Sequence, residues 1–314
     1  MPSINRGINY LLHNRAQFCD SIVKNFLGFL PDKLYLSLRY RCQMGHWINW
    51  KNPKTFTEKL QWLKVYDYKP EYTKMVDKLA AKDYVASRIG EEYIIPTLGV
   101  WDRVEDIDWD SLSDQFVLKT THGGGGGGVV VCSDKTHFDK AKAIKKLLTS
   151  MHSNAGKTYR ERPYLNVPRK IIAEKFMAER TAKVNTKNSD LPDYKFFCFN
   201  GKVKCFKIDF GRFVEHHANY YSPKGKLLPF GEKGLEPDPN HIEIMPENLN
   251  DMISIAEKLS KGFKFLRVDL YNVKGKIYFG ELTFYPAAGM GAFIPEEWDE
   301  KLGGMLNLDN HHVH

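Results

Sequence analysis

Six consecutive glycines lie between two short apolar segments that we expect to be strands, at 116–119 and 129–132. The run consists of Gly123, Gly124, Gly125, Gly126, Gly127 and Gly128. Glycine has no Cβ, so at the tip of a hairpin its N–H groups can approach phosphate oxygens closely. Lys119 precedes the run and would add a positive charge. The pattern predicts phosphate binding, whereas a glycine run taken alone is more typical of a flexible linker.

A second cluster of chemically capable residues lies near the C-terminus. Asp269 and Glu281 fall on neighbouring predicted strands, so a hairpin can bring both carboxylates to one point. Such a pair, beside phosphates, suits Mg²⁺. Arg267 projects from the same strand face as Asp269 and could stabilise developing negative charge. An ordinary salt-bridge network on a surface hairpin explains the same residues equally well.

A third segment, 171–177, reads Ile-Ile-Ala-Glu-Lys-Phe-Met. Its backbone could pair with the edge of an adenine while Phe176 and Met177 cover the ring. A core strand is the alternative.

These residues need a scaffold, and the pattern of the chain indicates an α+β fold with antiparallel hairpins. Residues 1–75 are predicted to be mainly helical. An apolar stripe is expected to pack in the core, and its residues are Ile8, Leu11, Leu12, Cys19, Ile22, Val23, Phe26 and Leu30. The alternative is a basic amphipathic face that rests on a membrane surface or on a partner. Thr55 and Glu58 have the spacing of a capping box. Helices are predicted over 76–89, 139–151 and 251–260, and Asn200-Gly201 predicts a hairpin between 194–199 and 202–210.

Composition limits the class of protein. The 314 residues are 42% hydrophobic and carry a formal net charge of +8, which favours an anionic ligand without identifying it. No apolar run is long enough to cross a bilayer, and no secretory signal is visible. The five cysteines show no Cys-x-x-Cys pair, and we expect a reduced, cytoplasmic protein. The chain contains no block of five or six consecutive Lys or Arg residues and no aromatic-basic signature, so the sequence does not predict nucleic-acid binding.

The order of the motifs along the chain resembles the ATP-grasp superfamily, and within it the teichuronopeptide-biosynthesis (TupA-like) family. The segments that carry the resemblance to this family are 50–60 and 281–286. The resemblance covers about residues 40–305. It implies an ATP-grasp fold, in which two α+β lobes clamp ATP, with a helical N-terminal region at 1–75. The lobes would span 76–175 and 176–305, followed by a tail at 306–314.

The resemblance also implies roles for individual residues. Lys78, on a helix, and Lys119 would bind the phosphates under the glycine hairpin, although Lys82 competes with Lys78 for its position. Glu174 would lie at the adenine, with the backbone of Lys175 and Met177 pairing its edge and Phe176 covering it. Asp193 would hold the ribose and Lys195 a phosphate or acyl-phosphate oxygen. Asp269 and Glu281 would bind Mg²⁺, with Thr283 at the third metal position, where the family pattern has Asn. Arg267 would steady the intermediate.

The implied reaction is ATP-dependent amide formation through an acyl phosphate. The implied substrates are a hexuronic acid carboxylate of a bacterial surface polysaccharide and an amino acid or another amine. Arg212, His216, His217 and Tyr220 could face the acceptor carboxylate or belong to a solvated loop. A kinase acting on a sugar or an amide is one alternative, and a non-enzymatic glycan- or nucleic-acid-binding protein is another. Contact with the inner face of the membrane, or with a lipid-linked glycan, is also compatible with the sequence.

Overall fold

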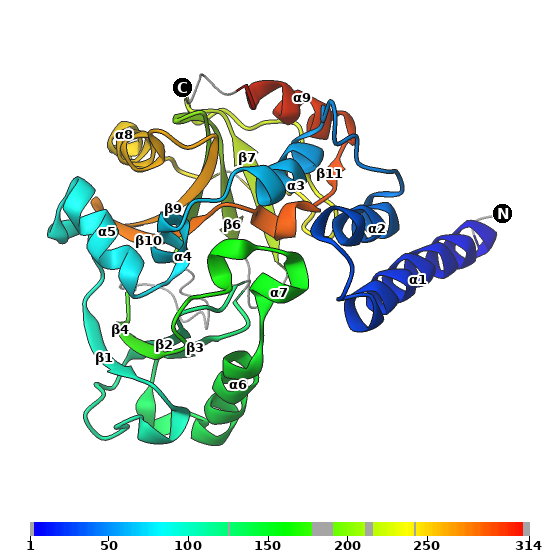
Figure 1. Cartoon of the computed structure of the whole chain (residues 1–314). Coiled ribbons are helices and arrows are strands. Elements are labelled where there is room, and N and C mark those ends of the chain that lie inside the picture. Colours follow the sequence, from blue (N-terminus) through cyan, green and yellow to red (C-terminus); the bar gives the residue numbers. More distant parts are fainter. Residues whose placement is uncertain (1–2, 125, 178–190, 211–215, 242, 310–314) are drawn as a thin grey trace.

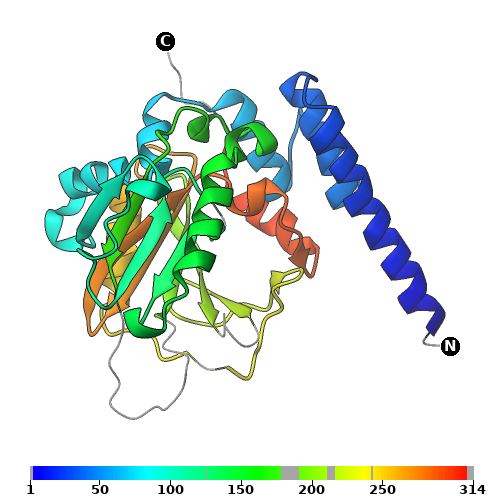
Figure 2. The same cartoon turned by 90° about the horizontal axis from the view of Figure 1, so that it is seen from below.

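The computed structural model describes residues 3–124, 126–177, 191–210, 216–241 and 243–309. The chain builds two lobes around two separate sheets, of four and of five strands. Helix α1 (Ser3–Phe26) extends away from both lobes (Figures 1 and 2). This confirms the predicted α+β organisation with a helical N-terminal region.

The smaller lobe carries the glycine run. Its sheet has the order β1-β4-β2-β3, and all three pairings are antiparallel. The strands are β1 (Thr97–Trp101), β2 (Phe116–Thr120), β3 (Val129–Cys132) and β4 (Ile171–Lys175). Helix α6 (Lys140–His152) begins after the N-cap Asp139 and packs Ala143 and Leu147 against the sheet. The strands that flank the glycines and this helix were therefore predicted correctly.

The larger sheet has the order β10-β9-β5-β6-β7 and is antiparallel throughout. Its strands are β5 (Asp193–Phe199), β6 (Lys202–Phe210), β7 (His217–Tyr221), β9 (Phe265–Val273) and β10 (Lys276–Thr283). The turn residues Asn200, Gly201, Lys274 and Gly275 all have positive φ, as two-residue hairpins of type I′ require. Both predicted hairpins are confirmed, but β7 was not predicted.

The two faces of the larger sheet are covered by different helices. On one face, the Cys198 thiol donates to the carbonyl of Ala256, so α8 (Leu249–Ser260) covers β5 there. On the other face, Phe56 of α3 (Phe56–Tyr66) contacts the rings of Phe197, Phe199 and Phe265. Helix α3 covers only the aromatic end of this second face. The other end of the face therefore carries charged side chains.

Helix α3 is fastened to the C-terminal part of the chain. The capping box of Thr55 and Glu58 is present, as predicted. The Thr57 backbone N–H donates to Asp299 of α9 (Glu297–Met305) at 2.9 Å, and Lys59 donates to the carbonyls of Gly303 and Leu306. Short strands β8 (Gly231–Glu232) and β11 (Phe293–Ile294) pair beside this helix. Helix α3 thus forms one core with the larger sheet, whereas α1 and α2 (Asp32–Met44) pack in a separate cluster.

The predicted helix over 76–89 is wrong at its start. Helix α4 (Glu71–Val76) ends at Val76, and α5 (Ala80–Ile89) begins after three intervening residues. Asp77 between them has extended backbone, and its carboxylate accepts the Leu79 N–H. Lys78 therefore lies on a turn, and Lys82 is the lysine on the helix. The lobe limits stay a prediction, although Val76, Ala81 and Val85 belong to the core of the larger sheet.

The apolar stripe of α1 only partly enters the core. Val23 packs with α2 (Asp32–Met44), but Cys19, Ile22 and Phe26 are exposed. The expectation that this stripe is a core face is therefore wrong for these three side chains. The helix is held at its base, where Asp20 accepts hydrogen bonds from Arg39.

Candidate functional site

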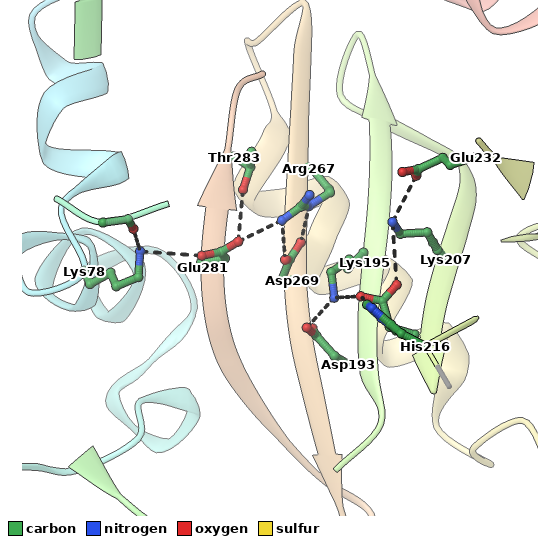
Figure 3. A network of polar contacts seen from close by, with 12 residues as sticks. Lys78, Asp193, Lys195, Lys207, His216, Glu232, Arg267, Asp269, Glu281 and Thr283 are labelled. Carbon is green, nitrogen blue, oxygen red and sulfur yellow. Dashed lines mark hydrogen bonds and ion pairs between the residues drawn. The ribbon is translucent and has the colours of Figure 1, made fainter. Parts of the chain in front are cut away.

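One row of directly opposed residues crosses all five strands of the larger sheet. From β10 to β7 it contains Glu281, Asp269, Lys195, Lys207 and Tyr220. A bulge at Gly280 sets the register, and a Cβ there would lie 3.0 Å from the Asp269 carbonyl oxygen. Opposed side chains project from the same face, so four charged groups line up on the part of the sheet that α3 leaves uncovered (Figure 3).

Arg267 lies between the two carboxylates of this row. Its Nε and Nη2 donate to the two oxygens of Asp269 at 2.7 and 2.6 Å, and Nη2 also donates to Glu281 at 2.8 Å. The Thr283 hydroxyl donates to Glu281 at 3.3 Å. The predicted convergence of Arg267, Asp269, Glu281 and Thr283 is present in the structure (Figure 3).

The two carboxyl groups differ in their electrostatic surroundings. Burial raises the pKa of Asp269 to about 7, and the neighbouring Asp193 carboxylate adds to the effect. Burial would also raise the pKa of Glu281, but Lys78, Arg267 and Lys195 together lower it to about 2. The site therefore holds one firmly ionised carboxylate and one that a further cation would help to ionise.

Lys78 joins the two lobes at this point. Its backbone N–H donates to the carbonyl of Thr121 and its ammonium donates to the carbonyl of Gly123. The same ammonium lies 3.7 Å from Glu281. A small hollow at this point is lined by Lys78, Tyr164 and Glu281 among others. The base of the glycine hairpin and the carboxylate row thus meet at one lysine, whose contact with Glu281 is drawn in Figure 3.

The glycines of the hairpin serve two different purposes. A Cβ on Gly123 or Gly128 would lie within 2.4 Å of the Thr120 hydroxyl, which is hydrogen-bonded to Ser150. Gly124 and Gly126 have nothing within 4 Å of a Cβ, and Gly126 has a φ of 74°. The outer glycines are needed for packing, and the inner ones leave open backbone. Gly125 lies outside the described residues.

Two lysines share one buried carboxylate in the smaller lobe. Glu174 on β4 lies 2.6 Å from Lys119 on β2 and 2.6 Å from Lys82 on α5. Burial would raise the pKa of Glu174, but the two lysines lower it below its ordinary value. Sequence reasoning preferred Lys78 over Lys82 for a single position; the structure brings both to the site, Lys78 beside Glu281 and Lys82 beside Lys119.

The other half of the row contains a second charged group. Lys195 forms ion pairs with Asp193 and, at 3.0 Å, with Asp209. Burial favours the neutral amine, but Asp193, Asp269 and Asp209 raise the pKa of Lys195. Lys207 lies 2.9 Å from Glu232, which also accepts the Tyr220 hydroxyl. Sequence reasoning did not identify Lys207 or Glu232, because the sheet register places Lys207 beside Lys195 and a separate short strand brings Glu232 to Lys207.

The remaining predicted residues occupy different places. Lys175, Phe176 and Met177 continue from Glu174, with Lys175 exposed and the other two half-buried. The two neighbouring histidines have different contacts. His216 lies 3.8 Å from Asp209, and His217 stacks on Phe210. Arg212 lies outside the described residues.

His122 is a further residue that the motif search overlooked. It directly precedes the glycine run, it is buried, and its Nε2 lies 3.0 Å from the carbonyl of Ser150. Its position beside Gly123 was the only available signal.

The two carboxylates of the row, Asp269 and Glu281, are candidates for binding a metal ion. Among the described residues, no three His, Cys, Asp or Glu side chains converge as a metal-binding group. Mg²⁺ needs fewer protein ligands, because it binds through one or two carboxylates together with phosphate oxygens. The oxygens of Asp269, Glu281 and Thr283 fit this requirement, and the ion would neutralise phosphate charge.

A glycine-rich hairpin on a small sheet, joined by a lysine to a row of lysines and carboxylates on a larger sheet, is the arrangement of the ATP-grasp class. The chain belongs to the TupA-like ATP-grasp family, whose family model matches residues 58–307. Members of the ATP-grasp class use ATP with Mg²⁺. The predicted family and fold are thereby confirmed.

Several solved structures are similar to this chain, at low sequence identity. No curated protein matches the chain. D-alanine–D-alanine ligase from Bacillus anthracis complexed with ATP is 15% identical with a TM-score of 0.40, over 74% of this chain and 63% of that one. N5-carboxyaminoimidazole synthetase from Staphylococcus aureus complexed with ADP is 15% identical with a TM-score of 0.41, over 71% and 50%. L-amino acid ligase from Bacillus licheniformis is 14% identical with a TM-score of 0.42, over 72% and 47%. The chain thus spans about half to two thirds of these proteins.

Proposed function

We propose that the protein is an ATP-dependent carboxylate–amine ligase that releases ADP. The observation that carries the proposal is the row of Glu281, Asp269, Lys195 and Lys207 on one sheet face, joined to the glycine hairpin by Lys78. A cationic lobe beside a carboxylate pair suits the transfer of a phosphoryl group, because such a transfer depends on positioning and charge neutralisation.

In this proposal ATP lies between the two sheets. Lys119, Lys82 and Lys78 hold the phosphates, and the open backbone of Gly124 and Gly126 covers them. Glu174 has two roles: it lies at the purine, and its ion pairs keep Lys119 and Lys82 in place. The backbone of Lys175 and Met177 pairs with the adenine, Phe176 covers it, and Asp193 holds the ribose.

The chemical step uses the charged row. An acceptor carboxylate attacks the γ-phosphate of ATP, which gives an acyl phosphate and ADP; an amine then displaces phosphate and forms the amide. Arg267 and Lys195 stabilise the negative charge on the transferred group. Asp269, Glu281 and Thr283 hold Mg²⁺, which neutralises charge on the phosphates.

The acceptor lies over Lys195, Lys207 and His216, with Arg212 as a further candidate. Cations at this end of the row suit a carboxylate, and the net charge of +8 suits an acidic glycan. Together with the family, these features support a hexuronic acid of a bacterial surface polysaccharide as the acceptor and an amino acid or another amine as its partner. The reaction would take place in the cytoplasm, without nucleic acid.

The experiment that tests the proposal replaces the amine with hydroxylamine. The full chain is incubated with Mg·ATP and a panel of uronic acids, and the products are identified by mass spectrometry. A hydroxamate formed together with ADP establishes carboxylate activation. A phosphorylated acceptor without hydroxamate would instead identify a kinase. ATP binding without ADP release on any acceptor would favour a non-enzymatic binding protein.

A further inference from the structure

The positive charge of the protein is concentrated at its N-terminus. The first 54 residues contain eight Lys and Arg but two Asp and Glu, whereas the remaining 260 contain 38 and 36. The N-terminal region therefore carries a net charge of +6 out of the total of +8. It consists of α1, α2 and the segment that leads to α3, and α1 projects from the two lobes (Figures 1 and 2).

The two acidic residues of this region are already paired with arginines of the protein. Asp20 is buried and paired with Arg39 at 2.6 Å. Asp32 is paired with Arg160 at 3.5 Å and with Arg162 at 3.3 Å. Six of the eight basic residues have exposed side chains, although Lys24 also lies 3.6 Å from Asp20. The six are Arg15, Lys24, Lys33, Arg41, Lys51 and Lys54. The outer surface of this region is thus strongly cationic.

The same region exposes large apolar side chains. Phe18, Ile22 and Phe26 repeat at intervals of four along α1 and so lie on one face of the helix. Phe18 is 67% exposed and Phe26 72%, and Phe29 in the following turn is 80% exposed. Aromatic side chains on one helix face with basic residues around them are typical of helices that lie in the interface of an anionic membrane.

The base of the helix is rigidly held, which leaves the outer face for an external contact. Arg39 donates to Asp20 and, through Nη1, to the carbonyl of Thr158 at 2.8 Å. Arg160 donates to the carbonyl of Gly28 at 2.6 Å. Among the described residues, none of the helices combines the length and apolar character that crossing a bilayer requires. A peripheral contact fits these features.

We propose that α1 docks on the surface of an anionic phospholipid bilayer, with Phe18, Ile22, Phe26 and Phe29 in the interfacial layer. Charge complementarity favours this occupant over a second copy of the chain, since two such cationic surfaces repel each other. The apolar face favours lipid over a dissolved acidic glycan, because immersion removes aromatic surface from water. The inference does not depend on the ligase chemistry.

The test is flotation of the full chain with lipid vesicles. The wild type is expected to float with vesicles that contain phosphatidylglycerol and to stay at the bottom with vesicles of phosphatidylcholine alone. The double variant Phe18→Ser/Phe26→Ser should lose flotation. Ile244→Ser, which removes a side chain that is 88% exposed outside this region, is the matched control and should float as the wild type does.

Charge is tested in the same assay. Arg15→Gln/Lys24→Gln should weaken binding to anionic vesicles about tenfold or more, whereas Lys224→Gln/Lys261→Gln removes two exposed charges elsewhere and should leave it unchanged. Absence of wild-type flotation, or equal flotation with neutral vesicles, would overturn the proposal. So would a dimer in light scattering that Phe18→Ser/Phe26→Ser dissociates. ADP release and thermal unfolding of each variant serve as folding controls.

Discussion

Asp269 on β9 lies directly opposite Glu281 on β10, and the single guanidinium of Arg267 donates to both carboxylates. This relationship requires the bulge at Gly280, because a regular strand would turn Glu281 to the opposite face of the sheet. An arginine and two carboxylates are thereby held in fixed positions before any ligand binds. Such preorganisation is what electrostatic stabilisation of a transferred phosphoryl group needs.

Removing either carboxylate should reduce phosphoryl transfer. We expect Asp269→Asn and Glu281→Gln each to lower ATP turnover by about two orders of magnitude, because each change removes a negative charge that pairs with Arg267 and, in the proposed function, would hold Mg²⁺. ADP formation measured against Mg²⁺ concentration checks this, and Glu281→Gln should also require more Mg²⁺. Asp251→Asn, an exposed carboxylate on α8, is the matched control. Wild-type turnover in either site variant would contradict the metal assignment.

The buried carboxylate of Glu174 should matter for stability as well as for ATP binding. Glu174→Gln leaves Lys82 and Lys119 without their shared anion, and we expect it to cost about 3–5 kcal/mol of unfolding free energy. Glu257→Gln, which breaks a surface pair with Lys202, should cost at most about 1 kcal/mol. Denaturant unfolding of both variants gives the comparison. Equal losses would show that the buried cluster is not a special stabilising feature.

The same carboxylate gives a pH dependence with a definite sign. The pKa of Glu174 is lowered from its ordinary value of 4.5 in the folded protein. Its contribution to stability is therefore fully present above about pH 4.5 and is lost as the pH falls through the lowered folded value. We expect the difference in unfolding free energy between the wild type and Glu174→Gln to shrink as the solution is acidified below pH 4.5. A difference that stays constant over this range would refute the pairing.

The two kinds of glycine in the hairpin can be separated experimentally. Gly128→Ala places a methyl group against the Thr120 and Ser150 hydroxyls and should cost about 1–3 kcal/mol of stability. Gly124→Ala meets nothing within 4 Å, so its stability should stay within about 0.5 kcal/mol of the wild type. Its added methyl group should nevertheless weaken ATP binding, since it blocks close approach to the backbone. Thermal unfolding together with calorimetric titration of ATP measures both effects. Unchanged ATP affinity in Gly124→Ala would argue against phosphate binding at the hairpin tip.

Local features of the fold could be predicted because their causes lie within a few residues. Asn200-Gly201 specifies a tight turn through the backbone freedom of its two residues, and Thr55 and Glu58 cap a helix within one turn. The convergence of Asp269 and Glu281 was predictable for a related reason, since one short hairpin connects them.

Other features depended on contacts between distant segments. The helix expected to begin at 76 begins at Ala80, because the Lys78 N–H donates to the carbonyl of the distant Thr121 at the intervening turn. Strand β7 carries Tyr220 to the end of the charged row, but its segment lacked a strong strand signal of its own. Neither Lys207 nor Glu232 could be recognised without the sheet register that places Lys207 beside Lys195.

The sequence by itself determined the types of residue, their order along the chain and the local turns, and these were sufficient to indicate the family. The tertiary structure decided which charges from distant segments meet: Lys82 with Glu174, and Lys78 with Glu281. It also decided that one face of α1 stays exposed. The physical reason is that ion pairs and burial depend on strand register and on the packing of segments far apart in the chain, which no local pattern encodes.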